Sequence, residues 1–352
     1  MSAEIPKFND VFVEMTGPGG LSSATVRRVF DAIFAGAWSP ASMAGFLISL
    51  RHTGNETPAV IAAAARAMRA VMIPVSHDFV VLLDTCGTGG DGSGTLNLST
   101  GAALIASAAG VPVAKHGNRA ATSRAGSADV LEAMGIPLDV PGARQAEVLL
   151  EAQIAFLFAQ THHPAMRHVM PVRRELGVRT LFNSLGPLAN PAGASHQLLG
   201  AFDDVIRPVL AGALAELGST RAWVVRSEDG LDEMSPFAAT RISEVANGRV
   251  REFSLTPEDF GLERSPAGAI AGADPAHNAR VLEAILKNEA HPARDAILLN
   301  AAAALVVALG IEPKAATERA RAALESGAAA ESLQRLRRAA NARRAEPSGS
   351  GE

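Results

Sequence analysis

A glycine-rich segment directly after a short apolar run limits what this chain can fold into more than any other feature of its sequence. Five glycines fall within the eight positions from Gly87 to Gly94, between the apolar run 79–83 and an alanine-rich stretch at 99–109. Glycine lets the backbone approach a ligand closely and adopt positive φ, and the free N–H groups at a helix start favour an anion. This order of strand, loop and helix therefore predicts a phosphate or pyrophosphate site.

Two common phosphate motifs fit this segment poorly. Gly87, Gly89 and Gly92 match the dinucleotide pattern G-x-G-x-x-G, but about 20 residues further on the chain has Lys115 rather than the acidic residue that binds a ribose hydroxyl. The P-loop pattern fails because Gly92 is followed by serine where lysine is required. The sequence thus favours neither a nicotinamide enzyme nor an ATPase.

The remaining sequence predicts an α/β protein with a small N-terminal helical domain and a larger domain whose mostly parallel sheet is flanked by helices. Serine–proline and threonine–proline pairs at 39–40 and 57–58 indicate helix starts. Short apolar runs between helical stretches are typical of a parallel sheet covered on both faces. We expect helices at 22–35, 39–51, 57–71, 99–109, 275–287, 292–309 and 313–325, and strands at 79–83, 111–114, 154–158 and 222–225. We expect domains at 1–75, completed by helices around 167–185, and at 76–345, followed by a disordered tail at 346–352.

Composition narrows the possible partners and compartment. The net charge of −4 gives no general attraction to nucleic acid or anionic lipid. The single cysteine, Cys86, excludes an intramolecular disulfide framework, which fits the cytoplasm. Residues 1–20 lack the apolar core of a secretory signal, and the run 296–309 contains Asn300 and is too short to span a bilayer, so we expect a buried helix and no membrane.

A basic stretch near the C-terminus permits a nucleic-acid interpretation, but we expect a solvated helix face. It contains Arg335, Arg337, Arg338, Arg343 and Arg344.

Several separate motifs, in order along the chain, resemble the anthranilate phosphoribosyltransferase family. They are residues 87–91, 97–100, 115–119, 126–129, 167–177, 182–191 and 229–233. The resemblance implies the nucleoside phosphorylase/phosphoribosyltransferase fold, Mg²⁺ as cofactor and a homodimer. It also implies the transfer of the phosphoribosyl group of phosphoribosyl pyrophosphate (PRPP) to anthranilate, releasing pyrophosphate, in tryptophan biosynthesis.

That chemistry needs leaving-group stabilisation and positioning more than proton transfer, so no general base is assigned. By resemblance, Asp232, Glu233 and the Ser99 hydroxyl would bind Mg²⁺, and Arg173 would pair with the anthranilate carboxylate. From sequence alone the neighbouring Arg174 could serve instead. The PRPP site would comprise Gly87, Gly90, Asp91, Thr95, Asn97, Ser99, Thr100, Lys115, Ser123 and Ser127, and the anthranilate site Gly87, His116, Asn118 and Arg173.

Other chemistry-bearing residues receive structural interpretations. His162 and His163 are adjacent, and adjacent side chains seldom converge on one metal ion, so we expect no metal there. Cys86 is expected to pack rather than act as a nucleophile. Arg226–Ser227 and the stretch 236–239 depart from the family pattern, which puts the local loop geometry in doubt.

Two alternatives remain open at this stage. One is a pyrimidine nucleoside phosphorylase-like enzyme, and the segments 115–119 and around Arg173 argue against it. The other is a non-catalytic nucleic-acid-binding relative, which should lack the acceptor residues Asn118 and Arg173.

Overall fold

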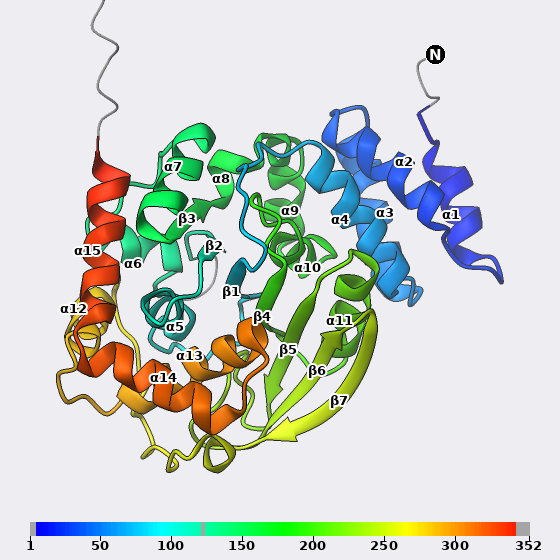
Figure 1. The fold of residues 1–352 in the computed structure, drawn as a ribbon. Helices are drawn as coiled ribbons and strands as arrows, with labels where there is room; N and C mark the ends of the chain where they lie inside the picture. The colour runs from blue at the N-terminus through cyan, green and yellow to red at the C-terminus, as the bar shows by residue number, and fades with distance from the viewer. Residues whose placement is uncertain (1–4, 121–123, 343–352) are drawn as a thin grey trace, which may run out of the picture.

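A computed structural model describes residues 5–120 and 124–342 of the chain. A small group of helices from the N-terminus lies beside a larger part built on one seven-stranded sheet, as Figure 1 shows. The predicted fold class is thus confirmed.

The first four helices form the small helical part, and three of them start where the sequence predicts. The hydroxyls of Ser22, Ser39 and Thr57 each accept a hydrogen bond from the backbone N–H three residues on. Such caps satisfy N–H groups that have no partner within the helix. The bounds are α1 Phe8–Thr16, α2 Ser23–Phe34, α3 Pro40–His52 and α4 Pro58–Ala70; α1 was not predicted.

The sheet has the strand order β3-β2-β1-β4-β5-β6-β7. The first five strands in this order pair in parallel, whereas β6 and β7 are antiparallel to their neighbours. The carboxyl ends of the parallel strands therefore lie along one edge. The strands are β1 Leu83–Gly87, β2 Val113–Gly117, β3 Ile154–Phe158, β4 His196–Gly200, β5 Arg221–Ser227, β6 Thr240–Ala246 and β7 Arg249–Leu255.

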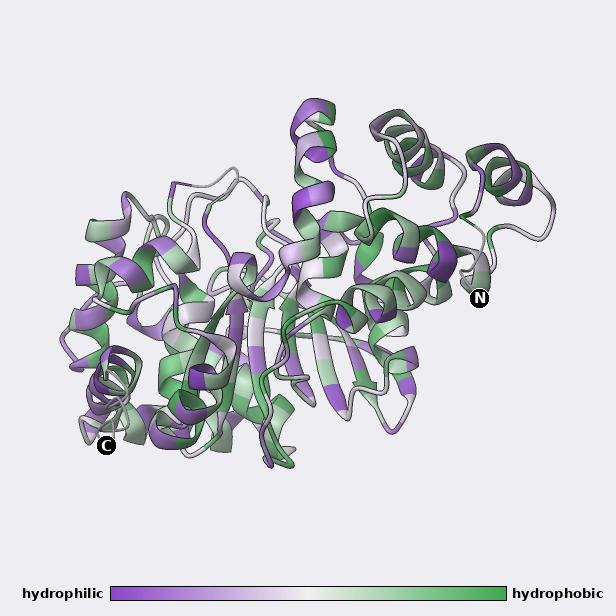
Figure 2. Ribbon diagram, turned by 90° about the horizontal axis from the view of Figure 1, so that it is seen from above, coloured by the Kyte–Doolittle hydropathy of each residue, from purple (hydrophilic) through white to green (hydrophobic). Residues whose placement is uncertain are grey.

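The sheet separates two hydrophobic clusters. Along β5, Trp223 and Val225 belong to one cluster, and Ala222 and Val224 to the other, because successive side chains of a strand point to opposite faces. One face carries α5 (Leu98–Ala108) and the C-terminal helices, and the other carries α11 (Ile206–Glu216) and the N-terminal helices. Figure 2, viewed from above, shows the sheet in the middle and the small helical part at one side.

The helices of the larger part complete both layers. Within the second cluster, Phe182 packs on Phe30 and Phe34 of α2, with ring centroids 5.6 and 6.2 Å apart. The segment around 170–185 thus packs with the N-terminal helices. The helices are α5 Leu98–Ala108, α6 Ser127–Ala133, α7 Gly142–Ala152, α8 Ala159–His162, α9 Met170–Leu176, α10 Phe182–Leu185, α11 Ile206–Glu216, α12 Pro275–Leu286, α13 Arg294–Leu309, α14 Pro313–Glu325 and α15 Ala328–Asn341, with 3₁₀ turns at Pro164–His168, Gly186–Leu188 and Pro257–Phe260.

Some predicted elements need correction. The strand expected at 79–83 begins only at Leu83 and continues through the polar residues Asp84 and Thr85, both fully buried. Hydropathy missed this because the Asp84 carboxylate is satisfied internally, by the amide of Asn190 (2.9 Å) and the backbone N–H of His116 (3.0 Å). The strand expected at 111–114 likewise lies later, at Val113–Gly117, and β4, β6 and β7 were not predicted.

The apolar run 296–309 forms α13, which is buried as predicted. Among the described residues, no single helix is long and apolar enough to cross a membrane, and only the pair α13 and α14, bent by 116°, passes by length and composition together. The tail predicted at 346–352 lies outside the described residues.

Candidate active site

Glycines at the ends of two adjacent parallel strands make room for an acidic loop. Gly87 ends β1, Gly200 ends β4, and the two are paired in register. A Cβ on Gly200 would overlap the main-chain carbonyl of Asp232, and one on Gly87 would lie 2.8 Å from Asp232 Oδ2. That carboxylate accepts a hydrogen bond from the Gly89 N–H at 3.2 Å. Glycine at both strand ends thus brings Asp232 against the glycine loop.

The loop after β5 that carries Asp232 and Glu233 is held by its own polar residues. The Ser227 hydroxyl accepts from the Leu231 N–H at 2.8 Å, and the Ser235 hydroxyl donates to Asp229 at 2.6 Å. Ser235 also accepts from the backbone N–H groups of residues 237 and 238, at 3.0 and 3.2 Å. The two segments that depart from the family pattern are therefore part of a closed, hydrogen-bonded loop.

Asn300 of the buried helix α13 anchors the same loop from below. Its side-chain amide donates to the carbonyl of Met234 and accepts from the N–H of Met234, both at 3.0 Å. Asn300 and Met234 are both buried. The polar residue that interrupts the apolar run therefore fixes the position next to Glu233.

Three carboxyl groups and one lysine share this end of the sheet. Burial and the nearby charge of Asp91 raise the pKa of Asp232 to about 7. Burial and the charge of Asp232 raise the pKa of Glu233 to about 8. Burial lowers the pKa of the Lys115 ammonium, against the opposing effect of nearby acids. Like charges at close range disfavour ionisation, so these acids are partly protonated near neutral pH, and a bound cation would favour their ionised forms.

The predicted Mg²⁺ ligands fit such a cation. Among residues 5–120 and 124–342, no three or more His, Cys, Asp or Glu side chains form a ready-made metal cage. Mg²⁺ does not need one, because it commonly keeps waters and substrate phosphates and takes one or two carboxylates from the protein. Asp232 and Glu233, together with the Ser99 hydroxyl at the start of α5, supply an oxygen-only set suited to it.

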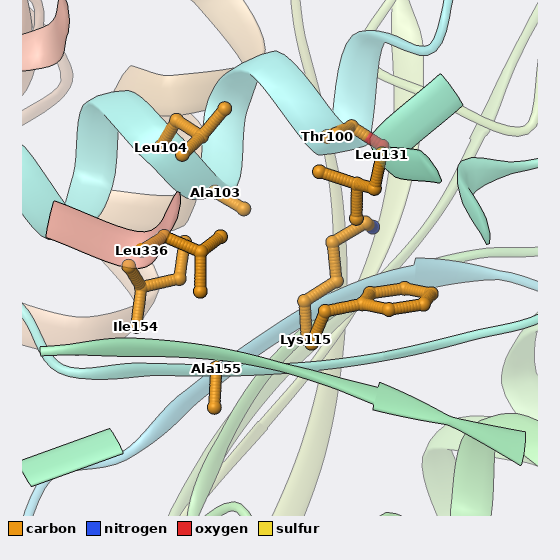
Figure 3. A pocket seen from close by; sticks show the side chains of 9 residues that line it. Thr100, Ala103, Leu104, Lys115, Leu131, Ile154, Ala155 and Leu336 are labelled. Atoms are coloured by element: carbon orange, nitrogen blue, oxygen red, sulfur yellow. The ribbon is translucent and has the colours of Figure 1, made fainter. Parts of the chain in front are cut away.

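Lys115 reaches from β2 to the first turn of α5. Its ammonium donates to the Thr85 carbonyl and, at 3.1 Å, to the Ser99 hydroxyl. Figure 3 shows its stem rising from the strand toward Thr100. Mainly aliphatic side chains beside it line a void of about 10 Å³. That void is too small for a ribose phosphate and is a packing defect. Lys115 therefore places a buried positive charge between β1 and the first turn of α5, the two elements that flank the glycine loop.

The far end of the glycine loop is pinned to the segment 270–272. Leu96 donates to the carbonyl of Ile270, and Gly272 donates to the carbonyl of Gly94, both at 2.9 Å, and Thr95 forms an isolated bridge with Ala271. The Asn97 side chain donates to the Ala125 carbonyl at 3.0 Å and accepts from Asn278 at 3.1 Å. Asn97 thus joins three segments, while the buried Thr100 Oγ1 has no partner among the described residues.

The predicted acceptor residues lie at the end of β1 (Gly87), on β2, in the loop after β2 and on α9. His116 is buried, and its Nδ1 faces the Gly186 carbonyl at 3.1 Å. Asn118 is exposed, and its Oδ1 accepts from the Arg119 N–H at 2.8 Å. Within the described part of the chain, no hydrogen bond or ion pair joins either of them to Arg173.

The two neighbouring arginines of α9 differ in environment. Arg173 is half-buried, with its guanidinium 5.9 Å from the Phe182 ring centroid, and burial lowers its pKa. Arg173 makes no ion pair with any described residue. Arg174 differs from it in being exposed to solvent. A partly desolvated guanidinium without a carboxylate partner is suited to an anionic ligand, so the geometry favours Arg173 over Arg174.

The adjacent histidines and the single cysteine have structural surroundings. His162 faces the Ile73 carbonyl at 2.8 Å, whereas His163 faces His116 with 3.3 Å between their Nε2 atoms. The two therefore point at different partners. Burial raises the pKa of the Cys86 thiol well above its usual range, so the thiol is protonated and a poor nucleophile.

The remaining predicted residues are placed as follows. Ser127 begins α6, with its hydroxyl 3.5 Å from the Asn118 carbonyl, and Ser123 lies outside the described residues. Arg337 and Arg338 of α15 pair with Glu283 and Glu331. Arg335 faces the carbonyl of residue 152, and Arg343 and Arg344 are not among the described residues.

Sequence reasoning missed three residues that shape the site: Gly200, Asn300 in this role, and Arg179. Gly200 ends a strand that was not predicted. Arg179, between α9 and α10, donates to the carbonyls of Gly89 and Gly90. The only signal for it was its place beside the 182–191 motif, because a contact between residues 90 positions apart leaves no local pattern.

Comparisons with known proteins agree with this architecture. Residues 80–330 match a family model described as "Glycosyl transferase family, a/b domain", and residues 15–72 match "Glycosyl transferase family, helical bundle domain". A glycine loop facing acidic residues at the carboxyl edge of a parallel sheet, with a helical bundle beside it, defines a transferase of this glycosyl transferase class.

Named relatives narrow the class. The chain is 48% identical over 341 residues to anthranilate phosphoribosyltransferase of Rhodospirillum rubrum, covering 96% of this chain and 97% of that protein. It is 47% identical over 325 residues to the enzyme of Myxococcus xanthus, covering 92% and 96%. The chain therefore belongs to the anthranilate phosphoribosyltransferase family.

Solved structures of the same family have the same fold. The anthranilate phosphoribosyltransferase of Thermus thermophilus superposes with a TM-score of 0.89 at 45% identity, covering 95% of this chain and 99% of that one. The Saccharomyces cerevisiae enzyme in complex with PRPP and Mg superposes with a TM-score of 0.86 at 30% identity, covering 95% and 97%.

Proposed function

We propose that this protein transfers the phosphoribosyl group of PRPP to anthranilate, giving N-(5-phosphoribosyl)anthranilate and pyrophosphate, in tryptophan biosynthesis. One observation carries the proposal: the glycine loop lies against Asp232, with Glu233 and the Lys115 ammonium at the same end of the sheet. That arrangement is suited to a diphosphate together with a divalent cation. The diphosphate is the leaving group that this reaction must stabilise.

The donor side of the site follows from the glycine loop and α5. Breaking the C1–O bond of PRPP leaves negative charge on the departing diphosphate. Backbone N–H groups of the loop and the positive charge of Lys115 would stabilise that negative charge. Mg²⁺, when bound by Asp232, Glu233 and Ser99, would neutralise part of the same charge. We propose the full donor set to be Gly87, Gly90, Asp91, Thr95, Asn97, Ser99, Thr100, Lys115, Ser123 and Ser127.

On the acceptor side, Arg173 would bind the carboxylate of anthranilate through its planar guanidinium. His116, Asn118 and Gly87 would contact the ring and the amine. The amine of anthranilate is nucleophilic without deprotonation, so orientation supplies most of what the chain must provide and no residue is assigned as a general base.

The assembly and location belong to the same proposal. We propose a homodimer in the cytoplasm, without a nucleic-acid or membrane partner. We also propose a domain boundary near residue 75, with the helical domain completed by the segment around 167–185 and the α/β domain reaching residue 345. The aromatic packing of Phe182 on α2 supports that completion.

The test follows the fluorescence of anthranilate in a mixture of protein, PRPP and Mg²⁺. We expect a loss of fluorescence that requires Mg²⁺ and is abolished in Glu233→Ala. The control is Arg174→Gln, which changes an exposed residue of α9 and should leave the rate unchanged. Unchanged fluorescence with folded wild-type protein would reject the proposed function.

A further inference from the structure

The glycine loop receives a side chain from outside its own part of the fold. Arg179 lies in the segment that joins α9 to α10, and its guanidinium donates to the carbonyl of Gly89 at 3.2 Å and to the carbonyl of Gly90. The same guanidinium stacks on the Phe202 ring, 4.3 Å from the ring centroid. One arginine thus connects the chain after α9, the chain after β4 and the loop.

We propose that Arg179 is a positioning residue for PRPP, which directs two backbone N–H groups of the glycine loop toward the diphosphate. The inference rests on the proposed function and adds a residue that neither the motifs nor the predicted site contains.

The geometry of the peptide unit gives the reason. In a planar trans peptide, the C=O of one residue and the N–H of the next point in opposite directions. Because Arg179 holds the carbonyls of Gly89 and Gly90 on its side of the loop, the N–H groups of Gly90 and Asp91 must point to the other side. Neither N–H has an acceptor within the described part of the chain, so both are available to an anion.

The backbone of the loop permits this orientation at little cost. Gly89 and Gly90 have φ angles of 68° and 78°, a region that L-residues other than glycine seldom adopt. A Cβ on Gly90 would also collide with the Arg179 guanidinium. Two successive glycines without side chains have many other conformations, however, so something must select this one. The charge-assisted hydrogen bonds of Arg179 do so, and stacking on Phe202 limits where the guanidinium can lie.

Lysine cannot replace arginine fully in this role. The two carbonyls are contacted by two different nitrogens of one planar group, and an ammonium on a flexible stem offers no such fixed pair. Arg179→Lys should therefore keep the charge but lose much of the loop orientation.

The experiment compares Arg179→Gln, Arg179→Lys and Phe202→Leu with the matched control Arg174→Gln, an exposed arginine of α9. We expect the KM for PRPP to rise about tenfold in Arg179→Gln, because both charge-assisted hydrogen bonds that orient the loop are lost. Arg179→Lys and Phe202→Leu should show smaller increases, and kcat should change much less than KM in all three. The PRPP-dependent increase in Tm, measured without anthranilate, should shrink in the same order.

Two results would overturn the proposal. The first is a KM for PRPP in Arg179→Gln that equals that of the control or falls below it, because the contact would then be irrelevant to PRPP or would have to break before PRPP binds. The second is a lower kcat and a lower Tm of the ligand-free protein in Arg179→Gln, with an unchanged KM for PRPP. That pattern is expected of a residue that only stabilises the fold. A wild-type protein that does not turn over PRPP would instead reject the proposed function.

Discussion

Replacing Asn300 by leucine tests whether the buried helix α13 positions the acidic loop. Leucine has the same branching and the same number of side-chain heavy atoms as asparagine, but it is bulkier and cannot form hydrogen bonds, so Asn300→Leu leaves the N–H and the carbonyl of Met234 without their partners. Both residues are buried, so water cannot replace the lost contacts. A buried polar group without a partner costs about 1–3 kcal/mol, so the free energy of unfolding should fall by about 2–6 kcal/mol.

The same change should also affect the metal, because Met234 follows Glu233 directly. Residues that orient metal ligands commonly change metal affinity by 10–100-fold when they are replaced, so the Mg²⁺ concentration for half-maximal activity should rise about tenfold. Urea unfolding followed by circular dichroism measures the first effect, and a Mg²⁺ titration of the anthranilate fluorescence assay measures the second.

A matched control separates stability from positioning. Gln145 is also buried, and its amide donates to the Phe156 carbonyl at 2.9 Å, in a part of the fold that does not touch the acidic loop. Gln145→Leu should lower the stability but leave the Mg²⁺ requirement unchanged. If Asn300→Leu lowers the stability and requires no more Mg²⁺ than this control, the anchoring role assigned to Asn300 is wrong.

Three further predictions follow from the site and the core. In Gly200→Ala the new Cβ runs into the Asp232 carbonyl, so kcat/KM should fall about tenfold or more through loss of loop position; activity within twofold of wild type would contradict the close approach. Arg173→Gln should raise the KM for anthranilate about 10–100-fold, the value of a bidentate charged contact, and equal effects of Arg173→Gln and Arg174→Gln in the same assay would remove that assignment. Burial lowers the pKa of His163 from 6.5 to about 4, so between these pH values the imidazole is protonated in the unfolded chain but neutral in the folded one. The contribution of His163 to the free energy of unfolding is therefore fully present above pH 6.5 and falls by about 3 kcal/mol as the pH drops toward 4. Urea unfolding at a series of pH values should show this slope, and it should be reduced in His163→Gln; an identical slope in the variant would refute it.

The sequence was sufficient for the parts of the fold that depend on local chemistry. Hydroxyl caps and prolines located α2 to α4 within a residue or two, and the apolar run around Asn300 became the buried helix α13. It failed for β4, because this strand contains histidine, glutamine and glycine and is apolar only at two positions. Its burial comes from pairing on both sides, which no local pattern records.

The candidate site divides in the same way. The glycine loop and the Asp232–Glu233 pair are local motifs, so their residues could be predicted, and the structure brings Asp232 to the loop. The contacts of Arg179 and Asn300 join residues 66 to 90 positions apart. Such contacts depend on how the layers pack, and only the three-dimensional structure reveals them.

The most direct measurement of the central claim is a crystal structure of this protein with PRPP and Mg²⁺. We predict that the diphosphate lies within hydrogen-bond distance of the N–H groups of Gly90 and Asp91, with a cation between it and the carboxylates of Asp232 and Glu233. A diphosphate bound elsewhere on the sheet edge, or acidic side chains turned away from it, would contradict this account.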